Sequence, residues 1–217
     1  MSVFQRLNGY AWVGLLFVVA LGRAQVSPSA APRAIDPGPV PADPAQRVAV
    51  FVPPVLFDEH AFIFVYRSLV NAGWYPVLVG ADTVIATGFD ETMVRPELRR
   101  NELTPDRFAG LVLIGGSGAA LHWQDSILFA AARAFEQEGK PVAAYGLAVP
   151  ILARAGLLDG RAAAFFPESE GIPLITDHGA RFAFGPVVAD GNIITGHGDD
   201  AARRFVETII RALEDRR

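Results

Sequence analysis

Short apolar runs alternate with amphipathic stretches from about residue 48 to the end of the chain. The apolar runs predict strands at residues 48–52, 75–79, 110–114, 142–145 and 162–165, with a closing pair at 187–189 and 193–195. The amphipathic stretches predict helices at 61–72, 125–138, 149–155 and 199–214. This alternation is typical of a mostly parallel sheet covered by helices on both faces. We therefore predict a single-domain α/β fold, a flavodoxin-like three-layer sandwich.

The first 24 residues have a different pattern, that of a leader. Arg6 gives a positive start, residues 10–21 are apolar, and Gly22 and Ala24 are small residues before Gln25. An apolar run of about a dozen residues suits a signal peptide, whereas spanning a bilayer takes about 20. We expect residues 1–24 to be a cleaved signal peptide, with an uncleaved membrane anchor or a misassigned start codon as alternatives. The domain is thus expected to be periplasmic or secreted, or membrane-anchored outside the cytoplasm.

Residues 25–46 are rich in proline and alanine and have too little apolar bulk to fold, so we expect an extended linker before a folded domain at 47–217. Without the leader, 17 basic side chains face 23 acidic ones, a net charge of −6. An acidic domain is a poor electrostatic match for phosphate backbones, which disfavours nucleic-acid binding. The chain has no cysteine, which excludes disulfides and a lipoprotein anchor on cysteine.

The most informative motif lies at residues 139–158, which read as a buried strand, a sharp turn and a helix. In α/β enzymes such a turn holds an exposed nucleophile at the edge of the sheet. Here the turn residue is Gly146, which has no side chain. The sequence thus predicts the strand, turn and helix of such a site, but no nucleophilic side chain at the turn.

This stretch resembles the PfpI family (the DJ-one-like proteins) of the class I glutamine amidotransferase-like superfamily, whose pattern is approximately Lys-Pro-Val-Ala-Ala-Ile-Cys-His-Gly-Pro. On that register Gly146 replaces the nucleophilic cysteine and Leu147 the histidine. The resemblance covers about residues 47 to 213 and includes the stretches 47–52, 108–116 and 186–198. It implies a domain whose thiol chemistry has been lost, and it implies a homo-oligomer, because the family commonly forms homodimers.

The resemblance also implies a glutamate at the start of the first helix, where the family uses it to tune the thiol. Counting back from the helix end at residues 71–73 places this position on Ala61, whereas a register slip of two residues places it on Glu59. His197 stands where the family usually has arginine. These departures agree with a site that has changed its chemistry.

In parallel α/β sheets, ligands bind at the carboxyl ends of the strands. This rule brings the loops at 53–60, 115–118, 146 and 196–198 to one edge. We predict a pocket at the former active site, lined by Glu59, His60, Gly116, Ser117, Gly146, Leu147 and His197. Gly146 has two interpretations: it leaves backbone N–H groups open to a polar ligand, or it marks decay after activity was lost.

Two other chemistries deserve comparison with this prediction. Ser117 follows a strand within a glycine-rich loop and invites a triad with Asp190 and His197, but Asp190 reads better as part of a hairpin turn with Gly191 and Asn192. The four histidines lack the spacing of a helical metal site. We therefore expect no metal and no cofactor.

The function predicted from sequence is that of an exported, catalytically degenerate PfpI-like domain, which binds a small molecule or a protein partner at the former active site. The alternative is an active hydrolase or amidase-type enzyme that uses Ser117 or a histidine-based site. A third interpretation, the sensing half of a regulator, is disfavoured because no helix-turn-helix pattern follows the domain.

Overall fold

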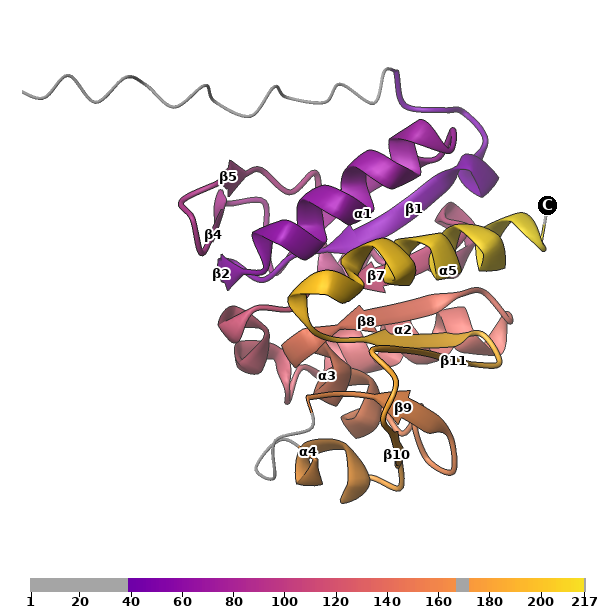
Figure 1. Cartoon of the computed structure of the whole chain (residues 1–217). Coiled ribbons are helices and arrows are strands. Elements are labelled where there is room, and N and C mark those ends of the chain that lie inside the picture. Colours follow the sequence, from indigo (N-terminus) through magenta and orange to yellow (C-terminus); the bar gives the residue numbers. More distant parts are fainter. Residues whose placement is uncertain (1–38, 167–171, 217) are drawn as a thin grey trace, which may run out of the picture. The chain divides into compact units, whose positions relative to one another are not determined.

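The structure is a computed structural model that describes residues 39–166 and 172–216 (Figure 1). The predicted signal peptide and residues 25–38 of the predicted linker lie outside the described residues. In the part of the chain that is described, no helix is both long and apolar enough to cross a bilayer.

A seven-stranded sheet forms the centre of the described domain, in the order β11-β12-β8-β7-β1-β3-β6. Its strands are β1 (Arg47–Phe51), β3 (Tyr75–Gly80), β6 (Leu98–Arg99), β7 (Gly110–Leu113), β8 (Val142–Tyr145), β11 (Val187–Asp190) and β12 (Ile193–Gly196). All neighbouring pairs are parallel except β11 with β12. The predicted mostly parallel α/β sheet is therefore confirmed.

Helices cover both faces of this sheet (Figure 1). They are α1 (Glu59–Asn71), α2 (Ser126–Gln137), α3 (Val149–Arg154), α4 (Pro173–Thr176) and α5 (Ala202–Glu214). Short 3₁₀ turns connect the elements: η1 (Pro44–Gln46), η2 (Arg100–Glu102), η3 (Pro105–Arg107), η4 (Ser117–His122), η5 (Gly146–Ala148) and η6 (Asp199–Ala201). The last helix begins three residues later than predicted, because Asp199–Ala201 adopt the tighter 3₁₀ turn first.

The pleat of β1 explains why its sequence is apolar from Val48 to Phe51. Val48 and Val50 point to the face packed with α1 and α5, whereas Ala49 and Phe51 point to the face packed with α2 and α3. All four side chains are fully buried. Burial of a valine or phenylalanine side chain contributes about 1.5–3 kcal/mol to folding, so a strand buried on both faces needs apolar residues throughout.

Two smaller sheets flank the central one. One contains β2 (Val55–Phe57), β4 (Ala86–Gly88) and β5 (Met93–Val94), and the other contains β9 (Ala162–Ala164) and β10 (Arg181–Ala183). The predicted strand at 162–165 therefore forms outside the central sheet. The Asp190 carboxylate and the Thr195 hydroxyl of the neighbouring hairpin accept the backbone N–H groups of Ala162 and Ala164, in place of a backbone ladder.

The closing hairpin has the form that the sequence predicts. Asp190 pairs with Ile193 in an antiparallel register, and Gly191 and Asn192 make a two-residue loop. Gly191 has a φ of 63°, the left-handed conformation that such tight turns require. Asp190 is thus part of a structural turn, and its carboxylate is bound to Ala162 N–H.

Candidate functional site

The site is built where β8 ends and the chain turns sharply into a helix. Tyr145 is the last residue of β8, Gly146 opens η5, and α3 follows directly from Val149. β8 lies between β7 and β12, so this turn is at the carboxyl edge of the sheet and near its middle. Ligand sites of parallel α/β sheets occupy this edge.

Gly146 has left-handed backbone geometry, with a φ of 55°, and is buried. An ideal Cβ built on it would lie 3.7 and 3.8 Å from Cε2 and Cζ of Phe166, which is ordinary van der Waals contact. Among the other residues that the structure describes, none apart from the adjoining ones comes within 4 Å of that Cβ. The turn thus has the geometry of a nucleophile-bearing turn and space for a side chain that the residue lacks.

The glycine loop after β7 supports this turn by close approach of backbone to backbone. A Cβ on Gly115 would overlap the carbonyl oxygen of Tyr145, and one on Gly116 would lie 2.6 Å from Asp58 N. In addition, Asp58 N–H donates to Gly115 O over 3.0 Å. These glycines therefore hold the loop between the segment before α1 and the Gly146 turn.

Ser117 and Leu147 differ in their surroundings. Ser117 is exposed at the start of η4, whereas Leu147 is half-buried. The Trp123 indole donates its Nε1–H to Leu147 O over 2.8 Å. The end of η4 is therefore bonded directly to the turn that begins at Gly146.

Glu59 and His60 open α1, but their side chains lie in different environments. Glu59 is only 5% exposed, and its two carboxylate oxygens accept the backbone N–H groups of Asp90 and Thr92 at 2.7 and 2.6 Å. These bonds tie Glu59 to the turn between β4 and β5. His60 is exposed to solvent. Glu59 therefore has a structural task that its position in the sequence did not indicate.

His197 meets the Gly146 turn through aromatic side chains. Its ring centroid lies 5.3 Å from that of Phe166, the same ring that faces the vacant side-chain position at Gly146. The Tyr145 hydroxyl donates to Gly198 O, which fixes the following loop against the end of β8. Phe166 therefore connects His197 to the Gly146 turn.

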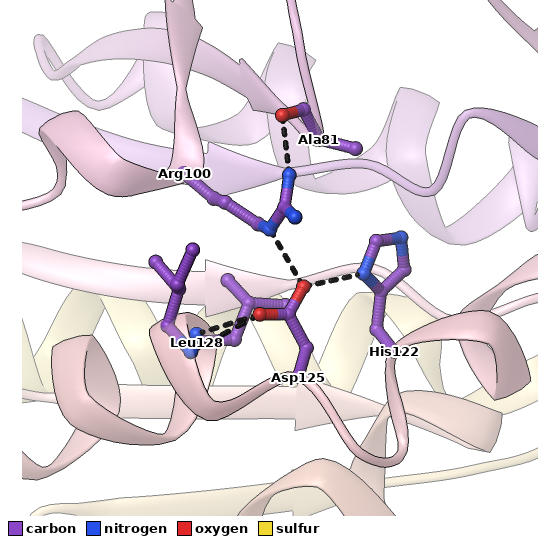
Figure 2. A network of polar contacts seen from close by, with 6 residues as sticks. Ala81, Arg100, His122, Asp125 and Leu128 are labelled. Atoms are coloured by element: carbon purple, nitrogen blue, oxygen red, sulfur yellow. Dashed lines mark hydrogen bonds and ion pairs between the residues drawn. The ribbon is translucent and has the colours of Figure 1, made fainter.

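A second polar cluster, shown in Figure 2, was not predicted. His122 Nδ1 is 2.9 Å from Asp125 Oδ2, and Arg100 Nε is 2.6 Å from the same oxygen. Asp125 Oδ1 accepts the backbone N–H groups of Ile127 and Leu128 and so caps α2. Asp125 before an apolar helical stretch is an N-cap signal in the sequence, whereas nothing local in the sequence points to Arg100.

Competing effects act on the Asp125 carboxyl. Burial by itself raises its pKa, but hydrogen bonds from His122 and from Leu128 N–H lower it, and so do the charges of Arg100 and His122. The lowering effects prevail, so the pKa of Asp125 is below its usual value. Asp125 is therefore a stable anion at neutral pH. Among the described residues, no group of three or more His, Asp or Glu side chains is placed to hold a metal ion.

The sequence profile of the DJ-1/PfpI family matches residues 46–212. This chain belongs to the DJ-1/PfpI family. The match spans the described domain from the residue before β1 almost to the end of α5. The family resemblance inferred from the strand and turn motifs is thus confirmed at the level of the family.

Relatives of this DJ-1/PfpI domain include archaeal proteins. An uncharacterized protein of Methanocaldococcus jannaschii is 34% identical over 114 residues, which is 52% of this chain and 56% of that protein. A protein of Pyrococcus abyssi named as a deglycase is 29% identical over 157 residues, 70% of this chain and 93% of that one. The deglycase PfpI of Pyrococcus furiosus is 31% identical and aligns with 48% of this chain and 63% of its own length.

Solved structures of DJ-1/PfpI proteins have the same fold. The ThiJ/PfpI domain protein of Brachyspira murdochii superposes with a TM-score of 0.74 at 22% identity, covering 78% of this chain and 97% of that one. DJ-1beta of Drosophila melanogaster gives a TM-score of 0.69 at 24% identity, covering 77% and 90%. At these identities the likeness concerns the fold, which is the flavodoxin-like α/β architecture predicted from the sequence.

Proposed function

We propose that this protein is an exported, catalytically degenerate member of the DJ-1/PfpI family that binds a small molecule or a protein partner at the Gly146 turn. One observation carries the proposal: a left-handed turn after β8 retains room for a side chain, yet its residue is glycine. In the family pattern described above, cysteine occupies this position. On this proposal, the turn keeps the backbone geometry of the family's active site but has no nucleophilic side chain.

The loss of thiol chemistry is supported by composition. The chain contains no cysteine, so no thiolate can act as nucleophile at this turn or elsewhere. Glu59, one of two positions considered for the tuning carboxylate, has both oxygens bonded to the backbone of the β4–β5 turn. A glutamate bound in this way stabilises the turn between β4 and β5.

Binding at the turn is supported by its surroundings. The ring of Phe166 lies against the vacant position and the ring of His197 packs against Phe166, while the Gly115 backbone borders the turn. An apolar wall beside polar backbone groups is typical of small-molecule sites. The same features would serve a peptide side chain inserted by a partner protein.

The names of three relatives suggest a different function, that of a deglycase. Proteins named deglycases from Pyrococcus align with this chain, and a deglycase without cysteine would need another reactive group. Ser117 and a histidine-based site are the candidates from sequence. The proposed triad for Ser117 loses support because Asp190 is engaged by Ala162 N–H and lies 3.7 Å from Arg181. We therefore favour binding over turnover.

Export and oligomerisation are further parts of the proposal. Residues 1–24 would direct export, and residues 25–46 would tether the domain or form a free mature N-terminus. Intact-mass measurement of exported protein tests this, since cleavage before Gln25 predicts one defined loss of mass.

Exposed apolar side chains on β2, η4 and β5 would support a homo-oligomer, namely Val55, Leu56, Leu121 and Met93. Sedimentation analysis of the wild type and of Met93→Asp tests that part.

The central experiment is a thermal-shift screen of the full chain against metabolites and short peptides. A compound that binds the native state raises the melting temperature by mass action. Gly146→Leu fills the vacant position and should abolish the shift. Gly156→Leu is the matched control, because Gly156 is also left-handed, with a φ of 77°, and a Cβ there meets no atom of the described residues within 4 Å. Equal losses in both variants would reject the Gly146 turn as the site.

Catalysis is tested in parallel on glyoxal adducts, peptides and esters. The proposal expects no turnover by the wild type above that of the uncatalysed reaction. Robust turnover that Ser117→Ala or His197→Ala abolishes would replace the proposed function by the hydrolase alternative.

A further inference from the structure

We propose that a cavity at the amino edge of the central sheet binds a free α-amino acid with an apolar side chain. The cavity has a volume of about 380 Å³ and is bordered by the segments that precede β1, β3, β7 and β8 and by the end of α5. Figure 1 shows the start of β1 and the end of α5 on the same side of the domain. Gly146 follows the other end of β8, so this cavity is separate from the Gly146 turn and does not depend on the function proposed there.

The floor of the cavity is apolar. Trp74, Phe108 and Leu213 line it, and none of them is more than 3% exposed. Because these side chains belong to the packed core, they hold the shape of the floor. Small-molecule sites have volumes of about 300–1,000 Å³ and combine such an apolar surface with a few polar groups. The floor is therefore suited to a small apolar side chain of a ligand.

Two cationic side chains line the cavity from the β8 and α5 sides. Lys140 Nζ donates to Pro105 O and lies 3.1 Å from Glu138 Oε2. Arg216 Nη2 donates to Glu138 O over 3.0 Å, and its Nη1 lies 3.0 Å from the position of a Cβ on Gly139. An ammonium has three donors and a guanidinium five, so both groups keep donors for a ligand. These cations can bind a carboxylate.

Two carboxylates line the same cavity from η1 and η3, which contact each other. Asp43 Oδ1 accepts the backbone N–H of Ala45 over 2.8 Å. Within the part of the chain that the structure describes, neither Asp43 nor Asp106 forms an ion pair. The cavity thus presents carboxylates that the domain does not neutralise, next to cations with free donors. A ligand with a single charge would face two groups of its own sign, whereas a zwitterion complements both pairs.

A free apolar amino acid combines the three properties that this cavity selects. Its carboxylate would bind the two cations, its ammonium the two aspartates, and its side chain the apolar floor. A residue within a peptide lacks both charges, and an amine or a simple carboxylic acid has only one. The site should therefore distinguish free amino acids from their capped forms.

Indole N–H NMR of the full chain, titrated with L-phenylalanine, tests where the ligand binds. Trp74 lines the cavity, whereas the Trp123 indole donates to Leu147 O next to the Gly146 turn. We expect phenylalanine to shift the Trp74 signal and to leave the Trp123 signal in place. Trp74→Phe and Trp123→Phe assign the two signals. A shift of the Trp123 signal alone would place phenylalanine at the other edge of the sheet and overturn the proposal.

Capped ligands test the charge recognition. N-acetyl-L-phenylalanine lacks the ammonium and L-phenylalanine amide lacks the carboxylate, so each should bind roughly tenfold more weakly than phenylalanine, because charge-assisted hydrogen bonds are lost. L-serine, which has both charges and no apolar side chain, should also bind more weakly. Equal affinities for phenylalanine and its two capped forms would contradict the proposal.

Two substitutions separate the contributions of the cations and the carboxylates. Lys140→Gln should weaken phenylalanine and its N-acetyl form but not its amide, and glutamine can still donate to Pro105 O. Asp106→Asn should weaken phenylalanine and its amide but not its N-acetyl form. Asp106 is exposed, so the melting temperature of that variant should stay unchanged, and the exposed Asp177→Asn is its matched control. Unchanged affinity for phenylalanine in both variants would overturn the proposal.

Discussion

Phe166 covers the position that a side chain on Gly146 would occupy, with ring carbons 3.7 and 3.8 Å from the ideal Cβ. The two residues are twenty positions apart, and the connection through β9 brings them together. The contact distance is that of normal packing, neither a clash nor a void. The turn is therefore able to receive a side chain without displacing its neighbours.

Gly146→Ala should accordingly cost only the strain of a left-handed alanine, about 1–2 kcal/mol of unfolding free energy. Gly156→Ala should cost a similar amount, because its left-handed backbone also has open space around it. Gly115→Ala should cost several times more or prevent folding, since its Cβ would overlap Tyr145 O. Urea unfolding of the three variants measures the free energies of unfolding. If Gly146→Ala lost as much stability as Gly115→Ala, the turn would have no space for a side chain at residue 146.

Gly146→Cys should place a thiol at the amino end of the η5–α3 segment. We expect this thiol to titrate below the free-cysteine value of about 8.5, because a helix amino terminus favours the thiolate. Rates of alkylation by iodoacetamide as a function of pH give the titration. Gly156→Cys, at the other end of α3, is the control and should titrate normally. Identical curves for the two thiols would argue that no anion-stabilising site remains at the turn.

Glu59→Gln should destabilise the turn between β4 and β5. The carboxylate accepts two backbone N–H groups, whereas an amide offers one oxygen and turns its NH₂ group toward a donor. A buried donor left without an acceptor costs about 1–3 kcal/mol. Hydrogen exchange should show lost protection at residues 88–92, and Glu207→Gln on the exposed face of α5 should show none. If Glu59→Gln instead shifted the thiol pKa of Gly146→Cys without affecting residues 88–92, Glu59 would be the tuning carboxylate.

Asp125→Asn should reduce stability in a pH-dependent way. The pKa of Asp125 is lowered in the folded protein, so its charge stabilises the fold above the unfolded-state pKa of about 3.9. That contribution is lost as the pH falls through the lower native pKa. Because asparagine preserves the helix cap, the expected difference is about 1–2 kcal/mol at pH 7 and near zero in strong acid. Chemical unfolding from pH 7 to 2 measures it, with the exposed cap Asp43→Asn as the control. A difference that persists at pH 2 would contradict the charge-based explanation.

Much of the fold could be predicted from the sequence, because the strands of a doubly covered sheet are short and largely apolar. β8 and the hairpin of β11 and β12 agree closely with the predicted strands. The strands β2, β4 and β5 were not predicted, since runs of only two or three residues carry no clear periodicity. The strand at β9 was predicted but was placed in the wrong sheet, because side chains of the hairpin, which are distant in sequence, bind its backbone.

By itself, the sequence determined the strand, turn and helix around Gly146, the absence of a thiol and the family to which the chain belongs. These follow from local patterns: which residues are apolar, which can be left-handed, and which side chains are missing. Only the tertiary structure decided that Glu59 binds the β4–β5 turn, that Phe166 lies between Gly146 and His197, and that His122 and Arg100 share one oxygen of Asp125. Most of these contacts join residues twenty or more positions apart, so they depend on how the layers pack and leave no local signal in the chain.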